Sequence, residues 1–367
     1  MTRTRTGFSE RLGLRLPLIQ APMAGGPSSQ ELVAAASHAG ALGSFGCAYL
    51  QPADMKAQAA WVRARTDRPF GINLFVAPQP GEIPAEAQRA TIDALTGYYV
   101  KLGLPAPSPV APPYAPDLEA QLDAALQIRP AVFTVHLGML APERVRAFKA
   151  AGILLGGSAT GVEEARQLEA AGMDFIIAQG GEAGGHRGTW MRDPDEAMTG
   201  TLALTRMLVR AVDLPVVAAG GIMDGAGIAA VLALGAQAAQ LGTAFLACPE
   251  SGASALHKQT VLAAREDTTA VTRKFSGKPA RGFANRFMRE MATAPHLAFP
   301  AQNTLTGKLR SASAQAGDPD CVAMWAGQAA PLARALPAAE LVLQLEAELQ
   351  ASLASLSTLS TPSSTSR

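Results

Sequence analysis

One histidine lies in a glycine-rich segment where an imidazole can reach a bound molecule. His186 belongs to segment 179–188, in which five of the ten residues are glycine. Such a backbone can lie flat against a planar ligand. An imidazole titrates near neutral pH, so it can take a proton from carbon or stabilise an anion. We therefore interpret His186 as the candidate catalytic residue, with a histidine that only bonds loop backbone as the alternative.

The other reactive side chains have less favourable settings. Glu182, in the same loop, is either a second acid or base or a carboxylate that caps backbone N–H groups. The remaining histidines lack a comparable glycine setting: His38, His136, His257 and His296. The three cysteines are too widely spaced for a disulfide framework or a zinc site, and none falls in the loop: Cys47, Cys248 and Cys321. We predict no metal site, because no metal-ligand spacing occurs.

Two later glycine turns predict a phosphate site. Gly220-Gly221 and Gly242-Thr243 each follow a short apolar run. In α/β barrels the loops after the seventh and eighth strands bind phosphate through backbone N–H groups. The Thr243 hydroxyl can add one hydrogen bond. We therefore expect a phosphorylated cofactor.

The elements that must position these loops alternate along the chain. Short β-rich runs alternate with alanine-rich segments of helical spacing, which is typical of βα units around a parallel sheet. The predicted strands are 17–21, 41–45, 71–75, 132–137, 153–157, 175–178, 216–219 and 238–241. The helices predicted between them are 30–39, 53–65, 142–151, 162–171, 202–211 and 226–234. Eight strands match the closure of a (β/α)8 TIM barrel, whose active site lies at the carboxyl ends of the strands. Asn73 and Gln179 lie at the ends of two of them and are predicted to place amide groups in the barrel mouth, with amides that only bond loop backbone as the alternative.

Two segments extend this predicted barrel, which covers residues 1–250. Residues 79–116 are rich in proline and predict an insertion after the third strand that walls or covers the site. Residues 251–351 predict a helical C-terminal appendage packed on the barrel, with helices at 254–265, 319–330 and 338–356 and an irregular segment at 274–309. The Ser/Thr-rich end, 352–367, predicts a disordered tail.

Composition excludes several classes of function. The chain is 48% hydrophobic and 17% charged, so it is not globally disordered. Its 31 basic and 30 acidic residues leave a net charge of +1, so we expect no broad basic surface that would bind nucleic acid. No uninterrupted apolar stretch predicts a membrane span. We expect a cytoplasmic monomer or homodimer that acts on a small molecule.

Several segments together resemble one known family. Residues 20–26, 71–75, 179–188, 218–222, 240–243 and 325–328 are similar, in order and spacing, to class I nitronate monooxygenases, formerly called 2-nitropropane dioxygenases. The resemblance runs from about residue 10 to about residue 345. Each motif alone is shared with related families, whereas the set is fairly specific.

The resemblance implies a cofactor, a reaction and their residues. With the phosphate argument it assigns FMN binding to Pro22, Met23, Ala24, Asn73, Gln179, Gly184, Gly220, Gly221, Gln240, Leu241, Gly242 and Thr243. His186 matches the family's catalytic histidine. The implied reaction is oxidation of an alkyl nitronate, such as propionate 3-nitronate, by dioxygen to a carbonyl compound plus nitrite or nitrate. Lys308 resembles a family lysine near the pocket, with a solvated surface lysine as the alternative. His257 and Phe299 stand where relatives often carry tyrosine, which bears on substrate preference.

Two other readings of the same residues stay open. One is an FMN-dependent NAD(P)H:quinone or enoyl-thioester reductase on the same barrel, whose loops also resemble residues 182–186. Arg187-Gly188 and segment 325–328 favour the monooxygenase. The other is a barrel that binds flavin or phosphate without turnover, although barrels of this kind are predominantly enzymes.

Overall fold

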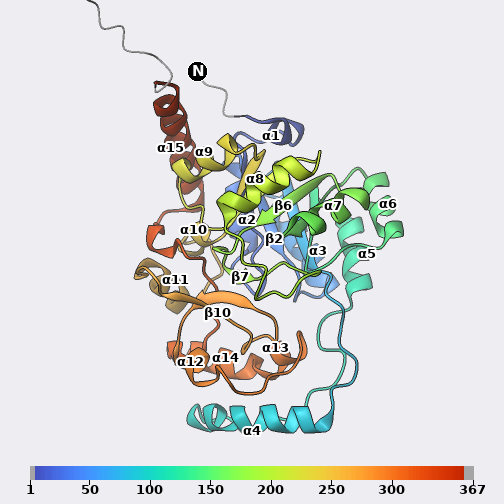
Figure 1. Cartoon of the computed structure of the whole chain (residues 1–367), viewed down its shortest axis with the longest axis vertical. Coiled ribbons are helices and arrows are strands. Elements are labelled where there is room, and N and C mark those ends of the chain that lie inside the picture. Colours follow the sequence, from blue (N-terminus) through green and yellow to red (C-terminus); the bar gives the residue numbers. More distant parts are fainter. Residues whose placement is uncertain (1–4, 359–367) are drawn as a thin grey trace, which may run out of the picture.

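A closed parallel barrel forms the centre of the molecule. The computed structural model describes residues 5–358, and Figure 1 shows the barrel with its helices around it. The strands follow the order β1-β2-β3-β4-β5-β6-β8-β9, and β9 pairs with β1 to close the ring. Their bounds are β1 Leu18–Gln20, β2 Leu42–Gly46, β3 Phe70–Phe75, β4 Val132–His136, β5 Leu154–Ala159, β6 Phe175–Gln179, β8 Val216–Ala219 and β9 Ala238–Leu241. The predicted (β/α)8 barrel and its eight strands are confirmed.

The helices between the strands also follow the prediction closely. The predicted six are α2 Gln30–His38, α3 Pro52–Arg63, α6 Pro142–Ala150, α7 Val162–Ala170, α8 Thr201–Ala211 and α9 Gly225–Ala233. Gly152, Gly172 and Gly235, which follow α6, α7 and α9, have φ angles of 75°, 85° and 99°. This left-handed conformation ends a helix at little cost only for glycine. A further helix, α5 (Leu118–Ile128), leads into β4 and was not predicted.

Apolar side chains fill the barrel at the amino ends of the strands. Phe8, from the short helix α1 (Gly7–Arg11), packs edge-on against Phe175 with ring centroids 5.0 Å apart. Gly156 makes room for this pair, because a Cβ there would lie 2.3 Å from the Phe175 ring. With this end packed, a ligand has space only at the opposite end of the barrel.

The segment after β3 does not cover the barrel mouth. It contains a long helix, α4 (Ala85–Lys101), at the far end of the molecule from the barrel (Figure 1). The Tyr98 hydroxyl donates to Glu290 at 2.6 Å, and the Tyr99 hydroxyl donates to the Leu305 carbonyl at 2.5 Å. The insertion therefore packs on the C-terminal appendage, and the expectation that it walls the site is wrong.

The appendage is not purely helical. After α10 (Thr243–Leu246), which still belongs to the barrel segment, it consists of α11 Ala255–Leu262, β10 Thr269–Thr272, β11 Ala280–Phe283, α12 Arg286–Glu290, α13 Ala301–Leu305, α14 Gly307–Gln315, η1 Pro319–Cys321, η2 Ala330–Leu332 and α15 Ala338–Thr358. The segment predicted as irregular, 274–309, therefore contains β11, α12, α13 and the start of α14. The helix predicted at 319–330 is replaced by two 3₁₀ turns, because Trp325 forms a β-bridge with Gly282 instead.

The last helix returns to the barrel. Helix α15 runs beside α9 (Figure 1), and Leu341, Leu345 and Leu349 join a buried cluster with side chains of α9 and α2. Residues 352–358, predicted as disordered, continue this helix, and the rest of the predicted tail, 359–367, lies outside the described residues. None of the described helices is long and apolar enough to cross a membrane.

The contact between α9 and α15 makes a prediction about stability. A Cβ on Gly225 would lie 2.2 Å from the Leu349 backbone nitrogen and 2.3 Å from the Glu348 Cβ. Gly225→Ala should therefore lower the free energy of unfolding by about 1–3 kcal/mol in urea denaturation, since α15 must shift. Gly97→Ala, on α4 with nothing within 4 Å, is the control and should be neutral or slightly stabilising. Equal stability of both variants would contradict the tight contact.

Candidate active site

A large cavity opens at the carboxyl ends of the barrel strands. Its volume is about 590 Å³. Twelve of the residues predicted from sequence line it: Pro22, Met23, Ala24, Asn73, Gln179, Gly184, His186, Gly220, Gly221, Gln240, Gly242 and Thr243. The appendage closes the other side with Trp325, Asn303 and Arg310, among others. The structure thus brings the predicted loops to one site, between barrel and appendage.

Two predicted residues are not among those that line the cavity. Leu241 is 1% exposed and packs in the cluster between α9 and α15, because successive residues of a strand point to opposite sides. Lys308 is exposed on α14, outside the cavity. Arg310, two positions later on the same helix, lines it instead. The predicted substrate contact of Lys308 therefore has no support in this structure.

His186 is held from both sides of the cavity. Its backbone lies in the short strand β7 (Gly185–His186), which pairs with β11 of the appendage in the register His186 to Ala280. Its ring Nε2 lies 2.9 Å from the Ser276 hydroxyl, also in the appendage. The ring is 8% exposed and packs edge-on against Phe75 and Phe299, at centroid distances of 5.6 and 5.4 Å. The imidazole therefore has a fixed orientation beside aromatic walls.

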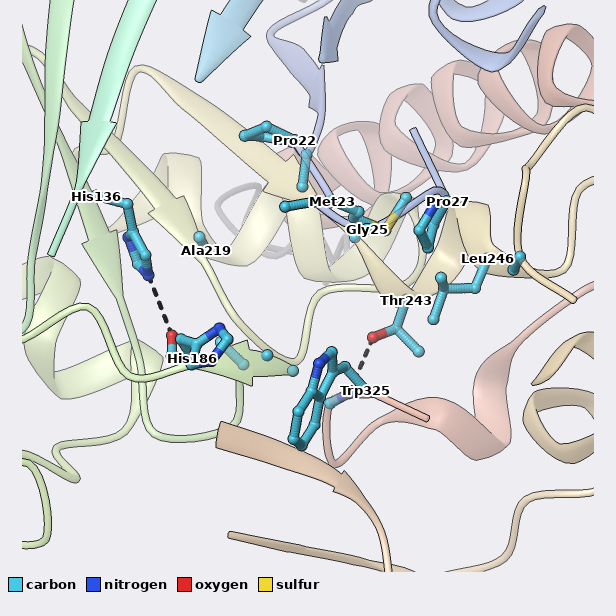
Figure 2. Close-up of a pocket in the computed structure, with 18 of the residues that line it drawn as sticks. Pro22, Met23, Gly25, Pro27, His136, His186, Ala219, Thr243, Leu246 and Trp325 are labelled. Atoms are coloured by element: carbon cyan, nitrogen blue, oxygen red, sulfur yellow. Dashed lines mark hydrogen bonds between the residues drawn. The ribbon is translucent and has the colours of Figure 1, made fainter. Parts of the chain in front are cut away.

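His136 belongs to the same group, and the sequence analysis missed it. It ends β4, and its Nε2 lies 3.2 Å from the His186 carbonyl oxygen (Figure 2). Since a carbonyl only accepts, Nε2 carries the proton, and Nδ1 accepts from the Ser158 hydroxyl at 2.8 Å. The judgement that His136 lacks a relevant setting is wrong. Its position at the end of a barrel strand is the signal that could have found it.

His257, set aside as a catalytic candidate but placed by the resemblance at a position that bears on substrate preference, also lines the cavity. It lies on α11, and its Nε2 donates to the Trp325 carbonyl at 3.1 Å. The Trp325 ring in turn lies 5.8 Å from that of His186, centroid to centroid. Only the resemblance indicated a position near the substrate for His257, because α11 and Trp325 meet only through the fold.

The two predicted amides present opposite hydrogen-bonding groups. Asn73 uses its NH₂ group on Thr134, at 2.8 and 3.2 Å, which leaves its carbonyl oxygen free to accept. Gln179 uses its carbonyl oxygen on Arg187, at 3.1 Å, and on the Gly188 N–H, at 2.7 Å. Its NH₂ donates to the His186 carbonyl at 2.9 Å and keeps a second hydrogen. The cavity wall therefore offers one acceptor from β3 and one donor from β6.

Glu182 has a structural role. Its carboxylate accepts from the Thr201 backbone N–H at 2.8 and 2.9 Å and from the Thr201 hydroxyl at 2.8 Å, at the start of α8. A carboxylate at this position satisfies unpaired N–H groups of the helix. The capping alternative therefore describes Glu182 better than acid–base chemistry. Among the described residues no Asp or Glu side chain lines the cavity.

The charge state of the cavity follows from burial. Burial, with the positive charges near it, lowers the pKa of His186 to about 3, and burial lowers that of His136 to about 4. Both rings are therefore neutral at neutral pH. Within the described chain, Arg310 is then the one permanently charged side chain on the cavity wall.

The opposite end of the cavity is suited to an anion. Figure 2 places Thr243, Met23 and Pro27 away from the two histidines, and Trp325 lies between His186 and Thr243 in this view. The Thr243 Oγ1 accepts from the Gly327 N–H at 2.9 Å, which leaves its hydroxyl hydrogen free. The backbone N–H groups of Gly221 and Thr243 donate to no acceptor in the described chain. These unpaired donors support the predicted phosphate site.

The sequence of this chain is similar to that of known proteins. A sequence profile described as "Nitronate monooxygenase" matches residues 10–348. The curated nitronate monooxygenase of Paraburkholderia phytofirmans is 44% identical to this chain over 348 residues, 93% of this chain and 94% of the relative.

Two solved structures share the fold. The nitroalkane oxidase of Streptomyces ansochromogenes is 43% identical, covers 94% of this chain and 98% of its own, and superposes with a TM-score of 0.88. The enoyl reductase domain of MlnA from Bacillus amyloliquefaciens superposes with a TM-score of 0.65 at 14% identity, over 97% of this chain and 99% of that domain. The second likeness shows the fold alone.

Because its buried histidines are neutral, the folded protein should be less stable in acid. Burial lowers the pKa of His257, like that of His136, to about 4, whereas an unfolded histidine titrates near 6.5. Below pH 6.5 the unfolded chain takes up protons that the folded chain does not, so stability falls with pH. Each such histidine should lower the free energy of unfolding by about 2 kcal/mol at pH 5 relative to its value at pH 7. Urea titrations at both pH values measure this loss.

His257→Asn isolates one contribution and should reduce the loss between pH 7 and pH 5 by about 2 kcal/mol. His38→Asn, which changes an exposed histidine on α2, is the matched control and should keep the loss of the unmodified protein. If the His257→Asn variant loses as much stability between pH 7 and pH 5 as the unmodified protein, His257 is not a buried neutral group.

Proposed function

The chain belongs to the nitronate monooxygenase family, and from this premise we propose that it uses FMN to oxidise alkyl nitronates with dioxygen to a carbonyl compound plus nitrite or nitrate. The observation that carries the proposal is the composition of one cavity. A neutral His186, aromatic rings and a single cation, Arg310, line one end of it, and unpaired backbone donors line the other. A planar anion and a phosphorylated ring system fit these two ends.

The residues present fit FMN. The free oxygen of Asn73 and the free N–H of Gln179 match the donor and acceptor edges of a flavin ring. The N–H groups of Gly221 and Thr243, with the Thr243 hydroxyl, suit its phosphate. Bound FMN would accept electrons from the nitronate and deliver them to dioxygen.

The side chains around His186 suit an anionic substrate. No carboxylate on the described cavity wall repels a nitronate, and the charge of Arg310 attracts one. Since His186 is neutral, its role is hydrogen bonding to the nitronate or acceptance of the α-proton from a neutral nitroalkane, not supply of a positive charge. The rings of Phe75, Phe299 and Trp325 pack around His186 and give the imidazole an apolar setting.

Oxygen uptake tests this function directly. The purified flavin-loaded protein should consume dioxygen rapidly with propionate 3-nitronate and without a nicotinamide, because the nitronate itself is the electron source. The parallel assay supplies NADH or NADPH with a quinone. No uptake with the nitronate, together with rapid nicotinamide oxidation, would assign the chain to the reductases instead.

His186→Asn tests whether the cavity is catalytic. The variant should keep its FMN, because the imidazole is not part of the proposed flavin contacts, and should lose about 100-fold or more in kcat/KM. Flavin absorbance of the dialysed protein measures retention, and oxygen uptake measures the rate. His38→Asn is the control. An unchanged kcat/KM in the His186→Asn variant would contradict a catalytic role for His186, whereas retained FMN with no oxygen uptake in the unmodified protein would support a cavity that binds flavin without turnover.

A further inference from the structure

Arg187 is a fully buried cation that lies behind the cavity wall and not on it. Its Nη1 donates to the Gln179 Oε1 at 3.1 Å and to the Gly180 carbonyl at 2.6 Å. Its Nη2 donates to the carbonyls of Gln179, at 3.1 Å, and Ala197, at 2.7 Å. The guanidinium is therefore fixed in place, and one of its hydrogen bonds ends on a side chain that lines the cavity.

No carboxylate within residues 5–358 pairs with this cation. Arg187 takes part in none of their ion pairs, and its Nε is a buried donor without a partner. Glu164 and Glu182, which are near enough to affect its pKa, accept hydrogen bonds from other groups. Burial, with the charge of Arg281, lowers the pKa of Arg187 to about 10, so it stays charged at neutral pH. A buried charge without a counter-ion is costly.

The structural role of Arg187 does not require a charge. Its hydrogen bonds to backbone carbonyls hold the loop that contains His186, but a neutral amide can hold a loop in the same way. The buried Gln121 does so, because its NH₂ group donates to the carbonyls of Cys47 and Leu50 at 3.1 and 2.8 Å. Loop support therefore explains the hydrogen bonds of Arg187 and leaves its charge to be explained.

Gln179 carries the influence of this charge to the cavity. Its Oε1 accepts from Arg187 and from the Gly188 N–H, at 2.7 Å, and its NH₂ group donates to the His186 carbonyl and keeps one hydrogen for a ligand. A cation bonded to the oxygen of an amide polarises the amide, so its N–H becomes a stronger donor. One amide group thus separates the positive charge from the molecule that binds in the cavity.

We propose that Arg187 is a positioning residue that acts through Gln179, and that its charge raises the reduction potential of bound FMN. This inference rests on the proposed function, because it requires FMN beside Gln179. Full reduction adds two electrons, which the nitronate supplies in the proposed reaction, and one proton to the neutral oxidised ring. The ring then carries a negative charge, which a nearby cation and a strengthened donor stabilise. A higher potential makes FMN a better acceptor of electrons from the nitronate.

The reduction potential of the bound flavin tests this role, by equilibration of the FMN-loaded protein with a redox dye. Arg187→Met removes the charge and should shift the equilibrium about 10-fold toward oxidised FMN, which is a fall of about 30 mV for two electrons. Arg187→Lys keeps the charge without the planar fork and should shift it by only about threefold. Loss of loop support alone would not produce this order of potentials.

Arg281→Met is the matched control. Arg281 is also buried, at 6% exposed, and donates to the Gly181 carbonyl at 3.1 Å and to the Thr269 hydroxyl at 3.4 Å. Neither partner lines the cavity. The variant therefore removes a buried arginine that holds the same loop without contact to a cavity side chain, and it should change the equilibrium by less than about threefold.

A second site keeps the test valid if Arg187→Met does not fold. Gln179→Met removes the amide, leaves Arg187 in place and should lower the potential about as far as Arg187→Met. In the Gln179→Met background, Arg187→Lys should cause no further fall, because the amide that links the two is gone. Equal potentials in the unmodified protein, Arg187→Lys and Gln179→Met overturn the inference. A purified protein that takes up no FMN overturns the proposed function and this inference with it.

Discussion

The structure depends on how the segment that contains His186 is held between barrel and appendage. The backbone of β7 pairs with β11, the His186 carbonyl accepts from His136 and Gln179, and its ring contacts Ser276. His136 is 50 positions before His186 and Ser276 is 90 positions after it. The orientation of the ring therefore exists only when the barrel mouth and the appendage have both folded, which explains why the appendage is part of the site.

Two buried charged side chains near the cavity, Glu164 and Arg187, bind the loops that form its wall. Glu164 is 1% exposed and accepts from Thr160 and from the backbone and hydroxyl groups of residues 189–191. Arg187, fully buried, donates to three backbone carbonyls and to the side chain of Gln179. Because each buried charge has partners close by, the loops keep their shape. The cavity that they enclose is left nearly neutral, so one cation can dominate its potential.

The fold alone does not decide the chemistry. The same barrel and appendage occur in an enoyl reductase domain at 14% identity, which shows that the scaffold accommodates different reactions. The chemistry of a barrel is set by the side chains at the strand ends and around its mouth. In this chain those side chains are neutral histidines, aromatic rings, two amides of opposite polarity and Arg310.

The sequence by itself determined the barrel, its eight strands, six of its helices and most of the predicted cavity residues, because strand and helix periodicity and glycine turns are local features. Local patterns did not indicate β11, which pairs with β10 nearby in the chain and with β7 and Trp325 far away in it. They also could not choose between Lys308 and Arg310. Two positions along a helix rotate a side chain by about 200°, so only the packing of α14 within the appendage decided which cation faces the cavity.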